Sequence, residues 1–310
     1  MRRKNAWTTY NKKQLDELEK LCKNYLKFLD KGKTERECVK QIVKQAEEKG
    51  YVNLADITKD KKALKAGDKV YSVCMDKTVA LFQIGKKKLE KGMNILGAHI
   101  DSPRMDVKQN PLYESEEFAY LDTHYYGGIK KYQWVTLPLA LHGVVVKKDG
   151  TVITVNVGED KNDPVFCVTD LLIHLAGEQM EKKANKVIEG ENLDVLVGSK
   201  PLEGKEKDAV KEGILEILKE KYDMTEEDFM SAEIEVVPAG HAREAGLDHS
   251  MVMSYGQDDR VCAYTALMAE IAAKNPEHTT FTILTDKEEI GSVGNTGLHS
   301  DYVHHAVEDL

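Results

Sequence analysis

The stretch Thr280-Phe-Thr-Ile-Leu-Thr-Asp-Lys-Glu-Glu-Ile-Gly-Ser292 decides how the chain is interpreted. Its apolar beginning predicts a buried strand, which runs into the adjacent carboxylates of Glu288 and Glu289 and then a glycine turn. Two neighbouring acids at the end of a buried strand are costly unless a positive charge lies beside them, and a metal ion is the usual partner. One carboxylate can bind the metal while the other transfers a proton. Because an isolated Glu-Glu pair is usually solvated surface, this interpretation depends on two further segments.

The first of these segments is Ile95-Leu-Gly-Ala-His-Ile-Asp-Ser-Pro103, an apolar strand that ends in His99. Residues two apart in an extended chain lie on the same face, so Asp101 is placed to accept a hydrogen bond from the imidazole of His99. Such a hydrogen bond fixes the tautomer and makes the other ring nitrogen a better ligand. The pattern therefore predicts that His99 binds a metal and that Asp101 orients it.

The second segment is Ser254-Tyr-Gly-Gln-Asp-Asp-Arg-Val261, a polar turn that leads into a helical pattern. Asp258 has two interpretations here: it caps the helix, or its carboxylate bridges two metal ions. Taken alone, the segment favours the cap. However, all three segments lie at strand ends in an α/β pattern, where open α/β sheets form their ligand sites. Together they favour a metal site.

The composition is that of a globular chain. Its 310 residues suffice for two domains, and 41% are hydrophobic and 31% charged. The net charge of -9 argues against a nucleic-acid partner. The five cysteines are scattered and form no C-x-x-C motif, which argues against a disulfide framework or a structural zinc cluster. We therefore predict a reducing, cytoplasmic setting.

No segment predicts a membrane partner. The basic start at residues 1–5 is followed by a polar helical pattern, so we expect no signal peptide. The longest apolar run, residues 134–146, contains Pro138, His142 and Gly143. Such a run cannot cross a membrane as a helix.

The periodicity of apolar residues divides the chain into an α/β part and a β-rich middle. Spacings of three to four predict two helices between residues 11 and 49, separated at Gly32, and strands follow between 69 and 99. The middle suggests an Asp149-Gly150 hairpin, a loop and helix over 169–179, an irregular stretch over 187–197, a helix over 208–222 and a return strand over 233–237. We therefore predict an α/β domain formed by residues 1–109 and 236–310, with a β-rich domain inserted over residues 110–235. The family resemblance described below implies that the first is catalytic and that the second serves oligomerisation or acts as a lid.

With these segments identified, the chain strongly resembles the aspartyl aminopeptidase family of metallopeptidases. The resemblance covers nearly the whole sequence, and it rests on six motifs: Gly97-Ala-His-Ile-Asp-Ser-Pro-Arg104, Tyr126-Gly-Gly128, Gly158-Glu-Asp160, Glu189-Gly-Glu-Asn-Leu193, Asp258-Asp-Arg260 and Glu288-Glu-Ile-Gly-Ser292. It implies a three-layer α/β/α phosphorylase-like peptidase core with an inserted β-rich dimerisation domain. It also implies a hydrolase, a metalloaminopeptidase with two Zn²⁺ ions in each active site.

The resemblance assigns a role to each matching residue. His99 would be a zinc ligand and Asp101 its hydrogen-bonded partner, while Asp258 would bridge both metal ions. Glu288 would be the general base, and Glu289 would bind one zinc. The expected reaction is removal of the N-terminal residue of a peptide substrate, with Asp or Glu as the preferred residue in this family. Three arginines near the motifs could recognise an acidic side chain, or they could be structural: Arg104, Arg243 and Arg260.

The resemblance further implies a homo-oligomer, a tetrahedral dodecamer built from dimers through the inserted domain. In that assembly a histidine from a neighbouring subunit reaches the active site. His174, in Leu171-Leu-Ile-His-Leu175, is our candidate for this residue, and the alternative is an ordinary histidine on the face of a helix. We expect His124 and His142 to be structural.

The family's site also requires a further Asp and a further His, both expected beyond Leu310, which lies 21 residues after Glu289. The tail contains Asp301, His304 and His305, which we expect to be surface helix and not this pair. The resemblance thus implies a C-terminally truncated version of the family, with open strand edges and uncovered apolar faces. Two hypotheses follow: a zinc aminopeptidase, or a non-catalytic remnant that retains assembly or binding capacity.

Overall fold

A computed structural model describes residues 4–60 and 62–310. The first three residues of the basic start and Lys61 therefore lie outside the described residues. Contacts divide the chain into two compact units. The first unit contains the residues up to Asp101 together with His241–Glu288 and Ser292–Leu310, and the second contains Ser102–Gly240 with Glu289–Gly291. The sequence predicts an inserted domain over residues 110–235, which is shorter at both ends than the Ser102–Gly240 segment of the second unit.

The first unit is built on a five-stranded sheet with the strand order β1-β2-β3-β13-β4. Strand β13 is antiparallel to β3 and parallel to β4, and Thr285 is the register partner of His99. Parallel strands end at the same edge of a sheet, so the segments that follow His99 and Thr285 emerge together. The strands are Val52–Asn53 (β1), Lys69–Cys74 (β2), Thr78–Gln83 (β3), Asn94–His99 (β4) and Thr280–Thr285 (β13).

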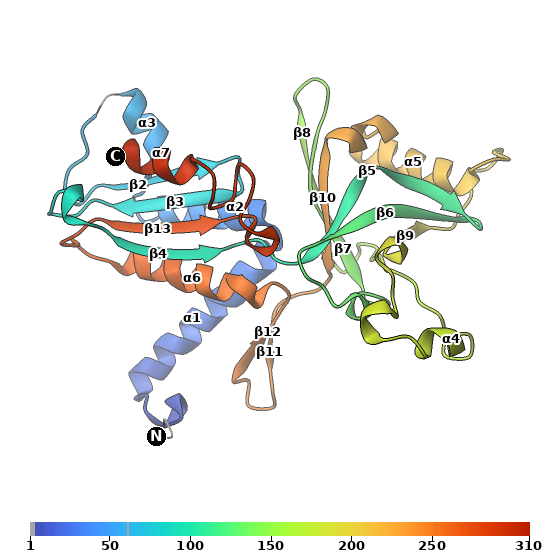
Figure 1. Cartoon of the computed structure of the whole chain (residues 1–310), viewed down its shortest axis with the longest axis horizontal. Coiled ribbons are helices and arrows are strands. Elements are labelled where there is room, and N and C mark those ends of the chain that lie inside the picture. Colours follow the sequence, from blue (N-terminus) through green and yellow to red (C-terminus); the bar gives the residue numbers. More distant parts are fainter. Residues whose placement is uncertain (1–3, 61) are drawn as a thin grey trace. The chain divides into compact units, whose positions relative to one another are not determined.

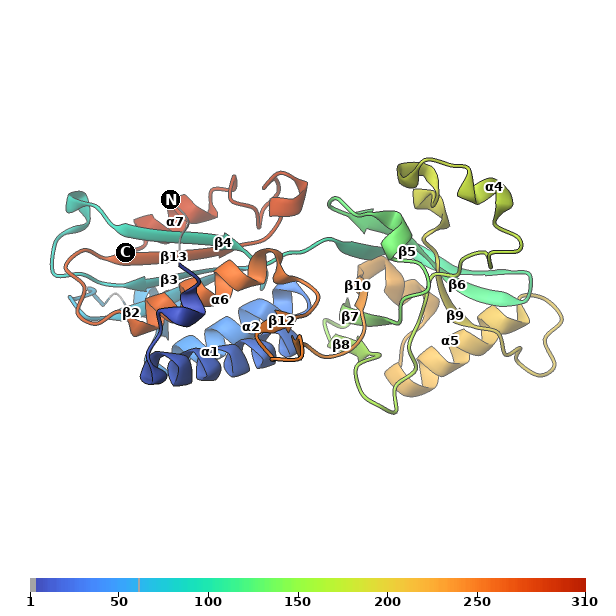
Figure 2. The same cartoon turned by 90° about the horizontal axis from the view of Figure 1, so that it is seen from below.

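Both faces of this sheet carry helices (Figures 1 and 2). Helices α1 (Lys12–Lys31), α2 (Glu35–Glu47) and α6 (Gln257–Ala272) pack on one face, whose core includes Leu81 and Leu284. The alternate residues of the same strands, including Phe82 and Phe281, pack with α3 (Leu54–Lys59) and α7 (Tyr302–Glu308) on the other face. The alternation of side chains along β3 and β13 thus supplies two cores. The predicted three-layer α/β/α architecture is confirmed.

The N-terminal helices begin and end where the sequence predicts. Helix α1 begins with a capping box between Asn11 and Gln14, and it ends at Gly32. Helix α2 begins with a second capping box, between Thr34 and Glu37. Such reciprocal caps provide partners for the amide groups at a helix start. Because α1 ends at Gly32 and α2 begins after Thr34, the predicted break at Gly32 is confirmed.

Strand β4 lies at one edge of the sheet. Among the described residues its strand partner is β13, on one side only. Ile95 and Leu96, which point to opposite faces, are 59% and 41% exposed. A strand with parallel pairing is normally covered on both faces, so β4 shows the open edge and uncovered apolar side chains that the family resemblance led us to expect.

The second unit is an antiparallel sheet of six strands in the order β8-β7-β10-β5-β6-β9. Helix α5 (Ala209–Tyr222) packs so closely on β9 that a Cβ atom at Gly198 would lie 2.6 Å from Ile214. The predicted Asp149-Gly150 hairpin joins β7 to β8. The strands are Arg104–Ser115 (β5), Phe118–Tyr126 (β6), Leu139–Val146 (β7), Val152–Val157 (β8), Val195–Gly198 (β9) and Ala232–Pro238 (β10).

Three local expectations need correction. Residues 169–179 form a loop with only the short helix α4 (Gly177–Met180), because their apolar side chains are exposed and do not pack as a helix face. The stretch 187–197, expected to be irregular, contains the start of β9, which pairs with β6. A hairpin of β11 (Arg243–Ala245) and β12 (Met251–Met253) was not expected. The short 3-10 helices are Ala6–Thr8, Leu89–Lys91, Lys131–Gln133, Ala184–Lys186, Gly190–Asn192, Glu226–Ser231 and Glu288–Ile290.

A buried carboxylate joins α6 to β13. Glu270 is 2% exposed, and it accepts hydrogen bonds from the hydroxyls of Tyr51 (2.9 Å), Thr280 (2.8 Å) and Thr282 (2.9 Å). Burial raises the pKa of Glu270 and outweighs the three hydroxyl donors, which lower it. The contact thus holds the helix that carries Asp258 against the strand that precedes Glu288.

The raised pKa of Glu270 predicts how stability depends on pH. The folded chain binds this proton more tightly than the unfolded chain, so this group stabilises the fold most below its ordinary pKa near 4.5. The contribution is lost as pH rises through the folded-state pKa. We expect Glu270→Gln, which cannot ionise, to gain free energy of unfolding relative to the parent between about pH 4 and pH 7. Urea unfolding measures this difference, with exposed Glu216→Gln as control, and a difference that does not change with pH would contradict the expectation.

Candidate metal centre

The candidate site lies in the first unit, where β4 and β13 end. The amide of Ile100 donates to the carbonyl of Thr285 at 2.8 Å, which joins the two strand ends. The side chain of His99 is 11% exposed. Its Nε2 atom lies 3.3 Å from Oδ1 of Asp258 and 3.6 Å from Oε2 of Glu288. Three segments that are distant in the sequence therefore meet at one imidazole nitrogen.

Asp101 orients two of these groups at once. It is fully buried, and its Oδ1 atom lies 3.3 Å from Nδ1 of His99. The same Oδ1 atom accepts a hydrogen bond from the backbone amide of Glu288 at 3.2 Å. The carboxylate therefore occupies the Nδ1 side of the ring and leaves Nε2 to face Asp258 and Glu288, the arrangement that the His-x-Asp spacing suggests.

The charge state of His99 follows from these neighbours. Burial lowers the pKa of His99, but the hydrogen bonds and charge of Asp101, with the charge of Asp259, outweigh it and raise the pKa to about 9. Without a metal the imidazole is therefore protonated at neutral pH. A proton holds the position between the carboxylates that a metal cation would take, so metal binding must displace it.

Asp258 lies at a kink in the first turn of α6, which begins after Gly256. The backbone of Asp258 has non-helical angles of φ -87° and ψ 112°. Its side chain is 85% exposed, and that of Glu288 is 56% exposed. Extended angles of this kind are those of a residue that precedes a helix, so capping and metal binding both stay open for Asp258. The argument that burial of the Glu-Glu pair demands a cation is wrong for Glu288, because water reaches its carboxylate.

The buried acid at the end of β13 is Asp286, which our sequence analysis passed over. It is fully buried, whereas Glu288, two residues later, is not. One signal was available in the sequence, because Asp286 directly follows the apolar strand. In the structure, the hydroxyls of Thr78 and Thr296 lie around it. Nothing local in the sequence, however, reveals which distant hydroxyls reach the strand end.

Glu289 and His174 belong to the second unit by their contacts. Glu289 directly follows Glu288 in the chain, and its role as a metal ligand stays a prediction. His174 lies in an exposed turn and not on a helix face, which corrects the structural alternative that we considered. Its neighbours Leu171, Leu172, Ile173 and Leu175 are 53–67% exposed.

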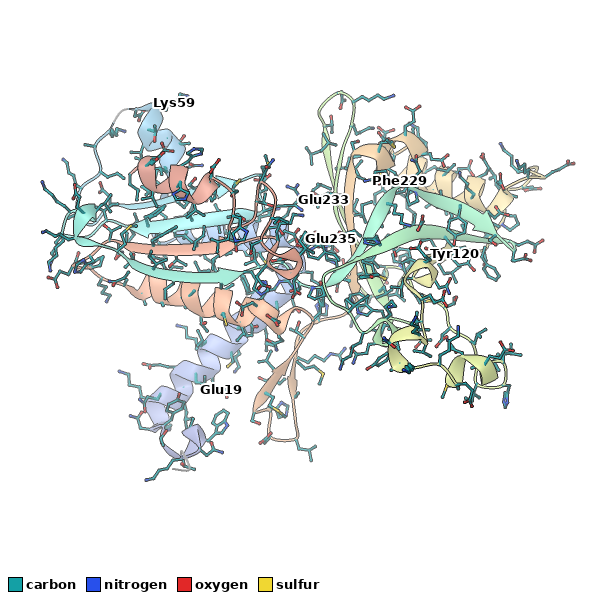
Figure 3. The ribbon with its side chains drawn as sticks, viewed as in Figure 1. Glu19, Lys59, Tyr120, Phe229, Glu233 and Glu235 are labelled. Atoms are coloured by element: carbon teal, nitrogen blue, oxygen red, sulfur yellow. The ribbon has the colours of Figure 1, made fainter. Side chains whose placement is uncertain are left out.

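Several other candidates have structural environments. Glu235 on β10 (Figure 3) and Asp106 lie 3.4 Å and 2.8 Å from Nε of buried Arg104. Arg260 is also buried, and it donates to the carbonyl of Lys33 at 2.8 Å. His142 is buried 3.1 Å from Glu159, as expected for a structural histidine. In the tail, Asp301, His304 and His305 are exposed at the start of α7 or within it.

The donor atoms around His99 suit a divalent metal. One imidazole nitrogen and two carboxylates are ligand types that Zn²⁺ accepts, and the carboxylates supply the negative charge that a cation requires. Asp101 holds the ring from behind, as a partner of a metal-bound histidine does. The residues present therefore fit zinc.

The family comparison agrees with this chemistry. The family described as Aminopeptidase I zinc metalloprotease (M18) matches residues 28–310. The chain belongs to the M18 family of aminopeptidase I zinc metalloproteases, which confirms the resemblance seen in the sequence.

Individual relatives share the sequence and the fold. The curated "Probable M18 family aminopeptidase 1" of Clostridium acetobutylicum is 59% identical over 308 residues, which are 99% of this chain and 66% of that protein. The crystal structure of an M18 aminopeptidase from Thermotoga maritima matches with a TM-score of 0.93 and 47% identity, covering 100% of this chain and 66% of that one. The crystal structure of aminopeptidase I from Clostridium acetobutylicum gives a TM-score of 0.91 and 58% identity, covering 100% and 68%. The chain thus spans about two thirds of the length of these relatives.

Among residues 4–60 and 62–310, no helix combines the length and the apolar character needed to cross a lipid bilayer.

The geometry predicts how His99 titrates. After metal is removed from the protein with a chelator, the imidazole of His99 should titrate at about pH 9 in NMR spectra. We expect Asp101→Asn to move the titration down by at least one unit, because the variant loses the negative charge while the burial that lowers the pKa stays. If His99 titrated alike in parent and variant, Asp101 would not be its partner.

Proposed function

We propose that the chain carries residues of the active site of a zinc-dependent aminopeptidase. The observation that supports this best is the convergence of the Asp258 and Glu288 carboxylates on Nε2 of His99, at 3.3 and 3.6 Å. Membership of the M18 family gives the reaction class, the hydrolysis of an N-terminal peptide bond.

The first-unit residues that would hold zinc are His99 and Asp258. Glu289, one residue after Glu288, is our third proposed ligand. The exposed Asp258 carboxylate has two oxygens, so it could be shared by two ions, and two Zn²⁺ per site is the proposal. When bound, zinc lowers the pKa of a coordinated water towards neutrality and polarises the carbonyl of the peptide bond.

Glu288 is the proposed general base. Its carboxylate is half-exposed, so it can reach a water molecule, and the Asp101 contact fixes its backbone amide. Glu288 would take a proton from the attacking water and deliver it to the amine that leaves. In this scheme Asp101 positions both His99 and Glu288 and itself transfers no proton.

The substrate would be a peptide with a free N-terminus, and a preference for Asp or Glu is the finer proposal. Recognition of an acidic side chain requires an accessible cation. Arg104 and Arg260 are buried in structural contacts and do not meet this requirement. Arg243, on β11, is exposed. It is the candidate that remains of the three named from the sequence.

We also propose that the chain assembles with copies of itself. The exposed apolar loop around His174 is the supporting feature, because contiguous apolar surface of this kind usually marks an interaction site. A Saccharomyces cerevisiae structure described as the mApe1 dodecamer shares the fold, with a TM-score of 0.70 and 19% identity. A dodecamer, the entry of His174 into a neighbouring active site and a cytoplasmic setting all stay predictions.

Substitution of the proposed base tests the function. Glu288→Gln should retain the zinc of the parent, measured by elemental analysis, and lose about 10²-fold or more in kcat, because only the proton acceptor changes. Exposed Glu277→Gln on the same unit is the matched control and should behave as the parent. Parental activity in Glu288→Gln would contradict the role of Glu288. A parent chain that binds zinc yet never cleaves an aspartyl or leucyl amide would favour the remnant hypothesis.

A further inference from the structure

Asp286 is a buried carboxylate that the chemistry proposed above does not use. It follows the last residue of β13, and no part of it is exposed. Its Oδ1 atom accepts a hydrogen bond from the amide of Lys287 at 2.8 Å, and its Oδ2 atom accepts one from the hydroxyl of Thr296 at 2.6 Å. A carboxylate this deeply buried costs stability unless such donors surround it.

Thr78, the first residue of β3, closes these contacts into a ring. Its hydroxyl accepts a hydrogen bond from the amide of Asp286 at 3.0 Å and donates one to the carbonyl of Thr296 at 2.6 Å. Thr78 and Thr296 are 1% and 5% exposed, so water does not compete for these bonds. Both ends of the segment 286–296 are thereby fixed to one point of the sheet. We call these three residues the clasp.

Between its fixed ends, the segment makes the turn that carries Glu288. Lys287 has a φ of +72°, and its carbonyl accepts from the amide of Ser292 at 2.7 Å. The chain then returns so closely that a Cβ atom at Gly297 would lie 2.3 Å from the carbonyl oxygen of Ser292. A segment of this length is normally mobile at a sheet edge, but here its base and its return are both held.

Two consecutive backbone amides of the turn donate hydrogen bonds to buried carboxylates. The amide of Lys287 donates to Asp286, and the next amide, that of Glu288, donates to Asp101 at 3.2 Å. The backbone that directs the Glu288 side chain is thus fixed from two sides. Asp101 ties it to the end of β4, and the clasp ties it to the start of β3.

We propose that Asp286, Thr78 and Thr296 are positioning residues, whose clasp holds Glu288 at its 3.6 Å distance from His99. The proposal rests on the proposed function for the role of Glu288 in hydrolysis. The clasp itself is a property of the metal-free chain. Thr296 is the best residue to substitute, because its hydroxyl is the clasp's contact with Oδ2 of Asp286 and it lies ten positions along the chain from it.

The test compares Thr296→Val with Thr296→Ser in the metal-free chain. Valine keeps the shape and removes the hydroxyl, whereas serine restores it. Hydrogen exchange of the Glu288 amide, followed by NMR, reports whether the turn is held. We expect exchange at least 10-fold faster than the parent in Thr296→Val and close to the parent in Thr296→Ser. If Thr296→Val does not fold, Asp286→Asn weakens the same contact at nearly constant size.

Thr280→Val is the matched control. It also removes a threonine hydroxyl that donates to a buried carboxylate, Glu270, but at the start of β13. A general loss of stability would speed exchange of the Glu288 amide in this variant too, whereas the clasp predicts no change. Equal exchange in Thr296→Val and the parent, or equal acceleration in Thr280→Val, would overturn the clasp.

A second measurement separates positioning from folding. With zinc bound, Thr296→Val should lose at least 10-fold in kcat while KM stays within about twofold, and Thr296→Ser should recover the rate. Faster exchange with an unchanged kcat would overturn the positioning role. If the parent chain neither binds zinc nor cleaves a peptide amide, the proposed function fails, while the exchange measurement still decides the clasp.

Discussion

The parallel pairing of β4 with β13 is the constraint on which the site depends. The register that sets Thr285 opposite His99 makes the two strands end together, so Asp101 can reach both His99 and the amide of Glu288. A shift of one residue would turn each side chain to the other face of the sheet. The hydrophobic cores on both faces fix that register, since Phe281 and Leu284 must enter opposite cores. Packing of the sheet thus sets the geometry of the polar groups at its edge.

Much of this could be predicted from the sequence. The spacing of His99 and Asp101 gave the contact on Nδ1, because the geometry of residues two apart in an extended chain is local. The helices of the N-terminal region and their break at Gly32 followed from periodicity and capping residues, which are also local. The proximity of His99 and Glu288 followed from their place after two adjacent parallel strands, whereas Asp258 comes from the start of α6 and not from a strand end of this sheet. The residues alone predicted a metal site without a reaction, and the family resemblance supplied the reaction, peptide hydrolysis by an aminopeptidase.

Contacts between distant segments were beyond such reasoning. Nothing near Asp286 in the sequence shows that Thr78 and Thr296 enclose it. We therefore expected the buried carboxylates at Glu288 and Glu289, whereas the fully buried one is Asp286. Asp258 was expected at a strand end, but it lies at the kinked start of α6. The apolar Leu171–Leu175 run suggested a helix face, but its side chains find no core and stay exposed. In each case the tertiary environment overrides a local preference.

A divalent metal is expected to bind at Nε2 of His99, and anomalous diffraction at the zinc edge would locate it. Crystals of the chain grown with Zn²⁺ should show anomalous density about 2.0–2.1 Å from Nε2 of His99, with an oxygen of Asp258 at about 2.0–2.2 Å. Asp101 should still contact Nδ1. Zinc bound elsewhere, while Nε2 keeps only its contacts to Asp258 and Glu288, would contradict the account.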